Sequence, residues 1–297
     1  MERKIQINNF LCKKCALCIE VCPNKLIIKN ETNEITSKSS WFDLCFKCGQ
    51  CMAICPSKAI EVNCLSYEKD FFDIPQAEPN LYENTFFELI HTRRAIRNFK
   101  DKKVPIELLT KIAEAISFAP PSFPPIKIKI IVVQNSEIIK RSLPYMIDFY
   151  EKLVKKMKNP IYRYLINKEI GHSKFETLQK HLIPLLISRL PALKDGTEDT
   201  IIRNAPAMIL FIADKNEEDF SKDISIAATY GILAAHALGL GASIMDILHP
   251  AINKIKELRS LYKIKENQIV LNSIIIGYPK FRYQRGIKRN LKCISWI

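Results

Sequence analysis

The sequence predicts an α+β protein in two parts, a small cysteine-rich domain followed by a larger domain of helices and strands. Eight of the ten cysteines fall within residues 12–55. Beyond them, helical patterns outnumber strand patterns and do not alternate with them as regular βαβ units, which favours the α+β class. With 297 residues, 47% of them hydrophobic, the chain is long and apolar enough for about two packed domains, and a disordered chain is excluded.

The elements of the larger domain are predicted from its apolar periodicity. Continuous apolar runs predict four buried strands, at 128–133, 207–213, 242–247 and 268–276. Amphipathic runs predict helices at about 84–95, 106–116, 223–238 and 251–262. A long Lys-rich helical region at about 137–190 is expected to be interrupted at Pro144, Pro160 and Pro184.

The domain boundaries follow from a stretch without sustained periodicity. Residues 65–82 contain Pro75, Pro79 and several acids, which is typical of a linker. The predicted organisation is therefore a small domain over 1–64, a linker over 65–82 and a larger domain over 83–297.

Charge and glycine content narrow the possible functions. The chain has 45 Lys and Arg against 31 Asp and Glu, a net charge of +14, but the basic residues are spread along it without an arginine-rich arm, so no nucleic-acid partner is expected. Residues 1–64 hold nine basic and six acidic residues, a net +3, so +11 lies in the rest of the chain. The chain has only eight glycines, and their positions match neither the G-x-G-x-x-G motif nor the G-x-x-x-x-G-K-[ST] motif of phosphate-binding loops.

The sequence predicts a cytoplasmic protein without a membrane partner. The first residues lack the apolar core of a signal peptide. The uncharged stretch 224–245 is long enough to span a bilayer, but it contains several polar residues and is flanked by Asp223 and Asp246. A buried helix that runs into a buried strand is the preferred interpretation.

The cysteines form two copies of one pattern, C-x2-C-x2-C-x3-C-P, offset by 33 residues. This is the bacterial ferredoxin signature, in which the fourth cysteine of each run ligates the other cluster. One [4Fe–4S] cluster is therefore assigned to Cys12, Cys15, Cys18 and Cys55. The second is assigned to Cys45, Cys48, Cys51 and Cys22.

Zinc binding and disulfide formation are two other interpretations of the cysteines, and both fit the pattern less well. Zinc ribbons use paired CxxC motifs, which a run of three cysteines with a fourth before proline fits poorly. Disulfides are disfavoured in a chain without an export signal. Cys64 and Cys293 lie outside the repeat and are expected to be ordinary thiols.

Four segments of the larger domain resemble motifs of the nitroreductase family of FMN enzymes. They are Arg93-Arg94-Ala95-Ile96-Arg97-Asn98-Phe99, Phe118-Ala119-Pro120-Pro121-Ser122, Ala234-Ala235-His236-Ala237-Leu238-Gly239-Leu240-Gly241 and Ile276-Gly277-Tyr278-Pro279. They occur in the family order across residues 83–297. The whole chain resembles a ferredoxin-fused nitroreductase, which implies a mixed sheet flanked by helices, FMN as cofactor, and a homodimer with FMN at the subunit interface.

The resemblance also implies the FMN-binding residues. Arg93 and Arg97, expected four apart on one helical face, would reach the phosphate and the O2/N1 edge of the flavin. The other residues expected at FMN are Arg94, Ala95, Pro121, Ser122, Ile244, Met245, Asp246, Arg285 and Arg289. No residue is assigned a catalytic role, because the flavin carries the reactive chemistry.

Two departures from the family pattern are evident. Ala95 stands where the family has a serine, so one hydroxyl donor is missing. After Ser122 the segment Phe123-Pro124-Pro125 replaces the family's asparagine and glutamine contacts to flavin.

The resulting functional hypothesis is an oxidoreductase that passes electrons from [4Fe–4S] clusters to FMN and on to an organic acceptor. The acceptor would be a nitro compound, a quinone or an activated alkene, and the donor reduced ferredoxin, flavodoxin or NAD(P)H. Two alternatives stay open at this point. One is a reductive dehalogenase of the same family, with residues at about 140–200 forming a lid, and the other is a non-catalytic electron-transfer or redox-sensor module.

Overall fold

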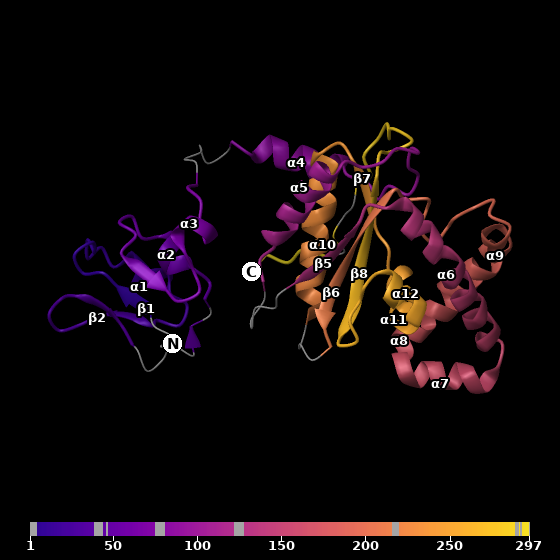
Figure 1. Ribbon diagram of the computed structural model, residues 1–297, viewed down its shortest axis with the longest axis horizontal. Coiled ribbons are helices and arrows are strands. Elements are labelled where there is room, and N and C mark those ends of the chain that lie inside the picture. Colours follow the sequence, from indigo (N-terminus) through magenta and orange to yellow (C-terminus); the bar gives the residue numbers. More distant parts are fainter. Residues whose placement is uncertain are drawn as a thin grey trace. The chain divides into compact units, whose positions relative to one another are not determined.

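The computed structural model describes residues 5–38, 44–45, 47–74, 81–121, 128–215, 220–288, 291 and 293–296. The chain divides into two compact units, Met1–Leu81 and Tyr82–Ile297 (Figure 1). Each unit is described by itself below.

The first unit is built from two pairs of short antiparallel strands and two short helices. β1 (Ile5–Ile7) pairs with β4 (Ile60–Val62), and β2 (Ile27–Lys29) pairs with β3 (Ile35–Ser37). The helices are α1 (Leu17–Val21) and α2 (Gln50–Ala53). The 33-residue sequence repeat is also a backbone repeat, because left-handed residues recur in three pairs, Lys14/Lys47, Ala16/Gly49 and Lys25/Lys58.

The segment that follows the cysteine repeat folds onto this unit, although the sequence suggested a linker there. α3 (Tyr67–Asp70) is capped by the Ser66 hydroxyl, which accepts a hydrogen bond from Glu68 N. Tyr67 and Phe71 pack against the core of the unit, which contains Met52, and the Tyr67 hydroxyl donates to Met52 O. Two aromatic side chains therefore anchor the start of the predicted linker.

The second unit is centred on a four-stranded sheet in the order β5-β6-β8-β7. Its strands are β5 (Lys129–Val133), β6 (Ala207–Asp214), β8 (Gln268–Gly277) and β7 (Gly241–Ile244), and all neighbouring pairs are antiparallel. A single parallel bridge between Ala95 and Ala242 adds the mixed character.

Helices cover both faces of this sheet. Alternate side chains along β6 point to opposite faces and identify the helices on each face. Ile209 and Phe211 point into one core, which they share with α5 (Ile106–Ser117) and α10 (Phe220–Ala237). Met208 and Leu210 point into the other core, which they share with the helices between β5 and β6 and those between β7 and β8 (Figure 1). Such two-sided burial explains why the strand is a continuous apolar run.

The second face is covered by a helical excursion between β5 and β6 and by two short helices near β8. The excursion comprises α6 (Ser136–Met157), α7 (Pro160–Ile170), α8 (His172–Thr177), a π-helical turn (Leu178–Leu182) and α9 (Ile183–Lys194). The short helices are α11 (Leu248–Lys254) and α12 (Lys256–Leu261), and α4 (Glu83–Thr92) opens the unit.

Three helix predictions were wrong in detail. α6 continues through Pro144, which is exposed, although proline removes one hydrogen bond of the helix. The helix expected over 251–262 is two helices, separated by extended backbone at Ile255. α4 ends at Thr92, before the arginine motif, where Arg93 takes up an extended conformation.

The stretch 224–245 is a helix followed by a strand, α10 and β7, as predicted. Within the described residues, none of the helices combines the length and the apolar character needed to cross a bilayer.

Candidate functional site

The eight repeat cysteines line two separate cavities. One cavity is lined by Cys12, Cys15, Cys18 and Cys55. The other is lined by Cys22, Cys45, Cys48 and Cys51. Each cavity thus receives three cysteines from one copy of the repeat and the fourth from the other copy, as the crossed assignment predicted.

The electrostatics of the thiols agree with this grouping. Burial, together with the charges of the neighbouring Cys45, Cys48 and Cys22, raises the pKa of Cys51 to about 11. Burial also raises the pKa of Cys18, beside Cys12 and Cys55. Four thiolates around one cavity repel one another and are unfavourable without a cation, and iron supplies that cation in a cluster. The cysteines therefore fit two clusters.

Equivalent hydrogen bonds to sulfur occur in both copies. Leu26 N donates to Cys22 Sγ and Ala59 N donates to Cys55 Sγ, each at 3.3 Å and 33 residues apart. Such bonds stabilise thiolate charge and raise the reduction potential of a bound cluster. Among the described side chains, no three of His, Cys, Asp or Glu converge closely enough for a single metal ion.

The arginine motif lies beside β7 in an extended segment, so the prediction of one helical face was wrong. Arg93 has φ −62° and ψ 136°, and Ile96 N donates to Ala242 O at 3.1 Å. Pairing with the end of the sheet competes with helix formation here and prevails. Because an extended chain rises about 3.3 Å per residue, Arg93 and Arg97 are separated by roughly 13 Å of backbone rather than one helical turn. The two cations suit two different groups of a ligand better than a shared phosphate.

Two family-motif glycines let this segment approach the sheet. A Cβ on Gly241 would lie 2.6 Å from Ile96 Cβ, and a Cβ on Gly277 would lie 2.7 Å from both Phe99 and Pro206. Both positions require glycine for space, since neither has a positive φ.

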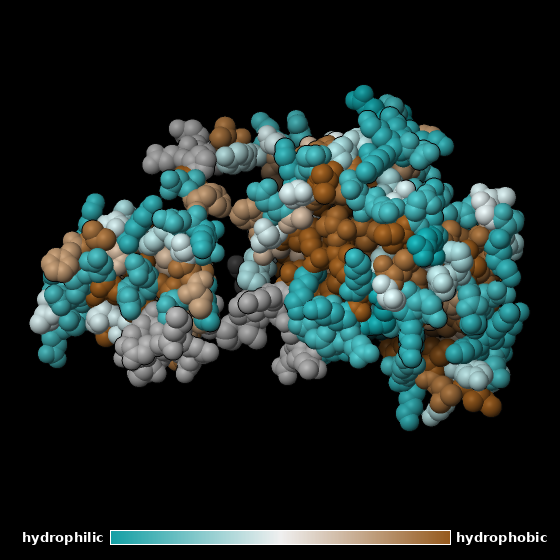
Figure 2. Space-filling model, in the orientation of Figure 1, coloured by the Kyte–Doolittle hydropathy of each residue, from teal (hydrophilic) through white to brown (hydrophobic). Residues whose placement is uncertain are grey.

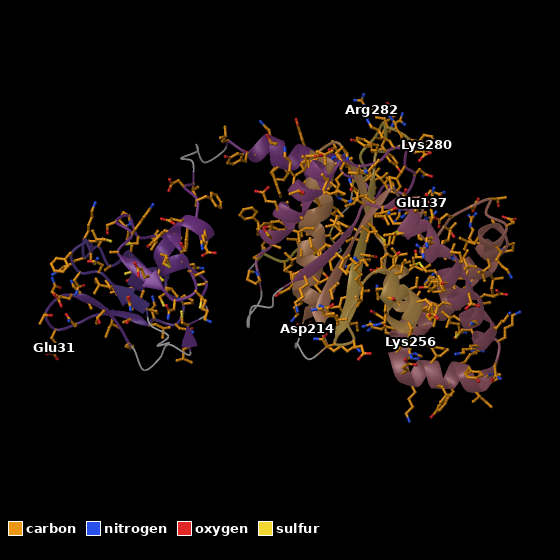
Figure 3. All side chains as sticks on the ribbon, viewed as in Figure 1. Glu31, Glu137, Asp214, Lys256, Lys280 and Arg282 are labelled. Carbon is orange, nitrogen blue, oxygen red and sulfur yellow. The ribbon has the colours of Figure 1, made fainter. Side chains whose placement is uncertain are left out.

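The chain end after β8 runs beside the same segment. Lys100 N donates to Tyr278 O at 2.8 Å and Lys280 N donates to Asn98 O at 3.0 Å. Figure 3 labels Lys280 and Arg282 at this end of the second unit. The approach continues to Gly286, where a Cβ would lie 2.8 Å from Arg94 Nη2. The structure therefore brings Arg285, which is exposed, to the neighbourhood of the arginine motif.

Arg94 and Arg93 lie near the carboxyl-terminal end of α10. Burial lowers the pKa of His236, and the charges of Arg93 and Arg94 lower it further. The His236 Nε2 atom is 2.9 Å from Thr92 Oγ1. Among the described residues, the buried Nε and Nη2 atoms of Arg94 have no hydrogen-bond partner. Two unsatisfied guanidinium donors next to further positive charge are suited to an anionic ligand.

Arg203 is a further candidate that the sequence did not reveal. Burial lowers its pKa, and Arg97 is the neighbouring charge that lowers it most, against the opposing effect of Asp199. Its φ is 63°, and its buried Nε has no partner within the described part of the chain. An isolated arginine just before a strand carries no motif, so only the fold could place it beside Arg97. A phosphate would relieve the repulsion between the two.

The remaining predicted residues are placed as follows. Ile244 ends β7, while the Met245 side chain is buried in the core and both its backbone N and its backbone O bond to Ser273. Asp246 and Pro121 are exposed. Ser122 and Arg289 lie outside the described residues. None of these assignments is tested individually, and each stays a prediction.

Comparison with known families decides the class of the protein. The nitroreductase family model matches residues 90–278, which is more than half of the chain. The chain belongs to the nitroreductase family. A 4Fe-4S dicluster domain matches residues 11–60. The predicted family and fold class are confirmed, as are the predicted iron–sulfur domain and an FMN-dependent oxidoreductase with FMN and two [4Fe–4S] clusters as cofactors.

The chain is similar to individual proteins at low identity. A protein of Methanothermobacter thermautotrophicus described as an NADH dehydrogenase/NAD(P)H nitroreductase is 26% identical over 196 residues, covering 65% of this chain and 76% of its own. A nitroreductase with bound FMN from Desulfitobacterium hafniense is 18% identical with a TM-score of 0.49, covering 71% of this chain and 97% of its own. An FMN-dependent nitroreductase from Clostridium difficile is 26% identical with a TM-score of 0.44, covering 68% and 91%.

Proposed function

We propose that this family member takes electrons from a donor through its iron–sulfur unit and delivers them at FMN to a small organic acceptor. The acceptor would be a nitro compound, a quinone or an activated alkene. The observation that supports this most strongly is the pair of crossed cysteine cavities in the same chain as the flavin domain. FMN can exchange electrons singly with clusters and in pairs with an organic molecule, so it joins the two kinds of transfer.

The chain's own residues would hold and orient the cofactor. Arg97 and Arg203 would bind the phosphate, since they are neighbouring cations and Arg203 has an unsatisfied donor. Arg93 and Arg94, about 13 Å and about 10 Å of extended backbone from Arg97, would stabilise negative charge at the flavin edge. Arg285 is proposed as an added cation from the chain end.

We also propose a homodimer. α4 exposes Phe86 and Phe87 on one side, where their rings meet edge to face. The chain end exposes six large apolar side chains, Phe281, Tyr283, Ile287, Leu291, Ile294 and Trp296. Apolar surface on this scale marks an interaction site, and a second copy related by two-fold symmetry would bury it.

The domain division and location are further proposals. We place the small domain at 1–64, a linker at 65–82 and the larger domain at 83–297, with α3 as the anchored start of the linker. A cytoplasmic location suits a protein whose eight ligand thiols must stay reduced.

The test is anaerobic purification followed by an acceptor screen. We expect about eight iron atoms and one FMN per chain, and rapid reoxidation of the reduced flavin by nitroaromatics or quinones. Stoichiometric zinc in place of iron would contradict the cluster assignment. Reoxidation by a partner protein alone would identify an electron-transfer module, and halide release from halogenated phenols would identify a dehalogenase.

A further inference from the structure

Helix α7 presents an apolar stripe to solvent. Ile161 is 70% exposed, Tyr164 68% and Leu165 50%, and their i, i+3, i+4 spacing aligns them along one side of the helix. Ile166 and Ile170, on the other side, pack against the core of the second unit. α7 is therefore apolar on two sides, and only one of them is covered within its own unit.

The surroundings of this stripe are strongly basic. Residues 152–168 contain six Lys and Arg and no Asp or Glu. The longer segment 152–190 contains nine basic and two acidic residues, a net +7, which is half of the charge of the whole chain. The exposed Lys156, Lys158 and Lys168 form no ion pair with any described residue, and Lys156 Nζ lies 5.7 Å from the Tyr162 ring centroid.

The stripe lies at an outer end of the unit, not in a groove. Figure 1 shows α7 along the lower edge of the second unit, and Figure 2 shows hydrophobic atoms bordered by hydrophilic ones at that edge. Long lysine side chains at the rim of such a helix can extend their charges sideways while the apolar stripe stays free to insert.

We infer that α7 and the lysines around it bind the surface of a membrane that contains anionic lipids. Ile161 and Leu165 would enter the boundary of the acyl chains, and Tyr164 and Tyr162 would lie at the level of the headgroups, where tyrosine is favoured. Lys156, Lys158 and Lys168 would face the lipid phosphates. This surface lies outside the proposed electron-transfer site, and it revises the expectation that the protein has no membrane partner.

An anionic lipid surface explains an apolar stripe surrounded by lysines better than nucleic acid or an acidic protein does. Nucleic acid would use the lysines but offers no apolar layer for the Ile161–Leu165 stripe. An acidic protein would need a concave apolar face to receive a helix. A bilayer surface satisfies both features, because apolar burial and attraction to anionic headgroups act together.

The experiment is cosedimentation of the holoprotein with vesicles of equal parts phosphatidylglycerol and phosphatidylcholine, compared with pure phosphatidylcholine. We expect binding to the anionic vesicles that weakens in high salt, and little binding to the neutral ones. Because each lysine near an anionic surface contributes about 1 kcal/mol, the variant K156Q/K158Q/K168Q should bind on the order of 100-fold more weakly. The variant I161Q/Y164Q/L165Q should lose about tenfold or more.

Matched controls lie elsewhere on the same unit. L185Q/I187Q removes exposed apolar side chains from α9, and K111Q/K140Q/K265Q removes three exposed lysines from other sites. Both should bind vesicles like the parent, and every variant should keep its iron and FMN, which verifies folding independently of binding.

Four outcomes would overturn the inference. They are failure of the parent to bind anionic vesicles, equal binding to neutral vesicles, unchanged binding by both α7 variants, and capture of polyglutamate or duplex DNA in place of vesicles. A change in molecular mass of the I161Q/Y164Q/L165Q variant in the absence of lipid would instead assign the stripe to a second copy. None of these results depends on the identity of the electron acceptor.

Discussion

At the scale of single residues, the pairing of Arg97 with Arg203 concentrates positive charge where the protein alone does not neutralise it. The pKa of Arg203 is lowered first by burial and then by Arg97, so keeping both side chains charged is unfavourable in the empty site. A doubly negative phosphate reverses that balance, because both guanidinium groups can then donate charge-assisted hydrogen bonds.

The variant Arg203→Gln should therefore bind FMN about 10- to 100-fold more weakly, since a hydrogen bond to a charged group contributes about 1.5–3 kcal/mol. Iron content should be unchanged. The measurement is fluorescence titration of FMN into the deflavinated protein, with Arg141→Gln, an exposed arginine on α6, as the control. Equal affinity of the parent and the Arg203 variant would remove Arg203 from the site.

Two histidines, His236 and His249, should make the stability of the second unit depend on pH. Burial lowers the pKa of His236, with Arg93 and Arg94 adding to the effect, and burial lowers the pKa of His249. The unfolded chain then binds protons that the folded chain does not. The stability that these groups contribute is present above the unfolded pKa of about 6.5 and is lost as the pH falls through the folded values.

The melting temperature of the flavin-binding unit should accordingly fall between pH 7.5 and pH 5.5. A H236Q/H249Q variant should show a shallower dependence, whatever its absolute stability, whereas H172Q, on the exposed side of α8, should keep the parent slope. An unchanged slope in the double variant would show that other groups set the acid sensitivity.

At the scale of elements, we propose that each cysteine loop supplies one ligand to the cluster of the other loop, and this makes the effects of single substitutions predictable. Cys55→Ser and Cys12→Ser should remove the same cluster, lowering iron from about eight to about four atoms per chain. Cys22→Ser should remove the other cluster. Electron paramagnetic resonance of the reduced protein distinguishes the two, and the exposed Cys64→Ser is the control. If Cys55→Ser instead matched Cys45→Ser, ligation would not be crossed.

The contact between the arginine segment and β7 gives a second prediction at this scale. Gly241→Ala would place a methyl group 2.6 Å from Ile96 Cβ, and overpacking of this kind costs about 1–3 kcal/mol. The variant should lose stability and FMN together, because the shifted segment carries the arginines. Adding Ile96→Gly, which removes the Cβ that the new methyl group meets, should restore part of the FMN binding. Chemical denaturation and flavin content measure the two effects, and non-additivity in the double variant reports the contact.

How far the sequence predicts the structure differs from element to element. β6 and β8 were predicted well, because both of their faces are buried and their apolar runs have no other explanation. The grouping of the cysteines around two cavities could be predicted from the repeat, whereas their ligation of clusters stays a prediction. The conformation of Arg93–Arg97 was not predictable, since it depends on pairing with Ala242, 145 residues after Arg97. Arg203 was missed for the same reason, because its significance lies in the effect of the Arg97 charge on it.

At the scale of the whole molecule, two separately packed units divide the work. Each unit has its own hydrophobic core, so loss of clusters from the first need not unfold the second. The charge is divided as well, since two oxidised clusters with four thiolates each would bring residues 1–64 from +3 to about −1, leaving the second unit as the basic one.

This division allows the electron donor to be identified. A reduced ferredoxin or flavodoxin delivers single electrons and should need the clusters, whereas NAD(P)H transfers hydride and should act on FMN directly. In a C22S/C55S variant that retains FMN, the rate of flavin reduction by reduced ferredoxin should fall at least tenfold, while reduction by NAD(P)H stays within a factor of two. Anaerobic stopped-flow absorbance of the flavin measures both rates, with C64S as the control. Equal rates with ferredoxin in parent and variant would mean that the clusters do not supply the flavin, and the fusion of the two units would need another explanation.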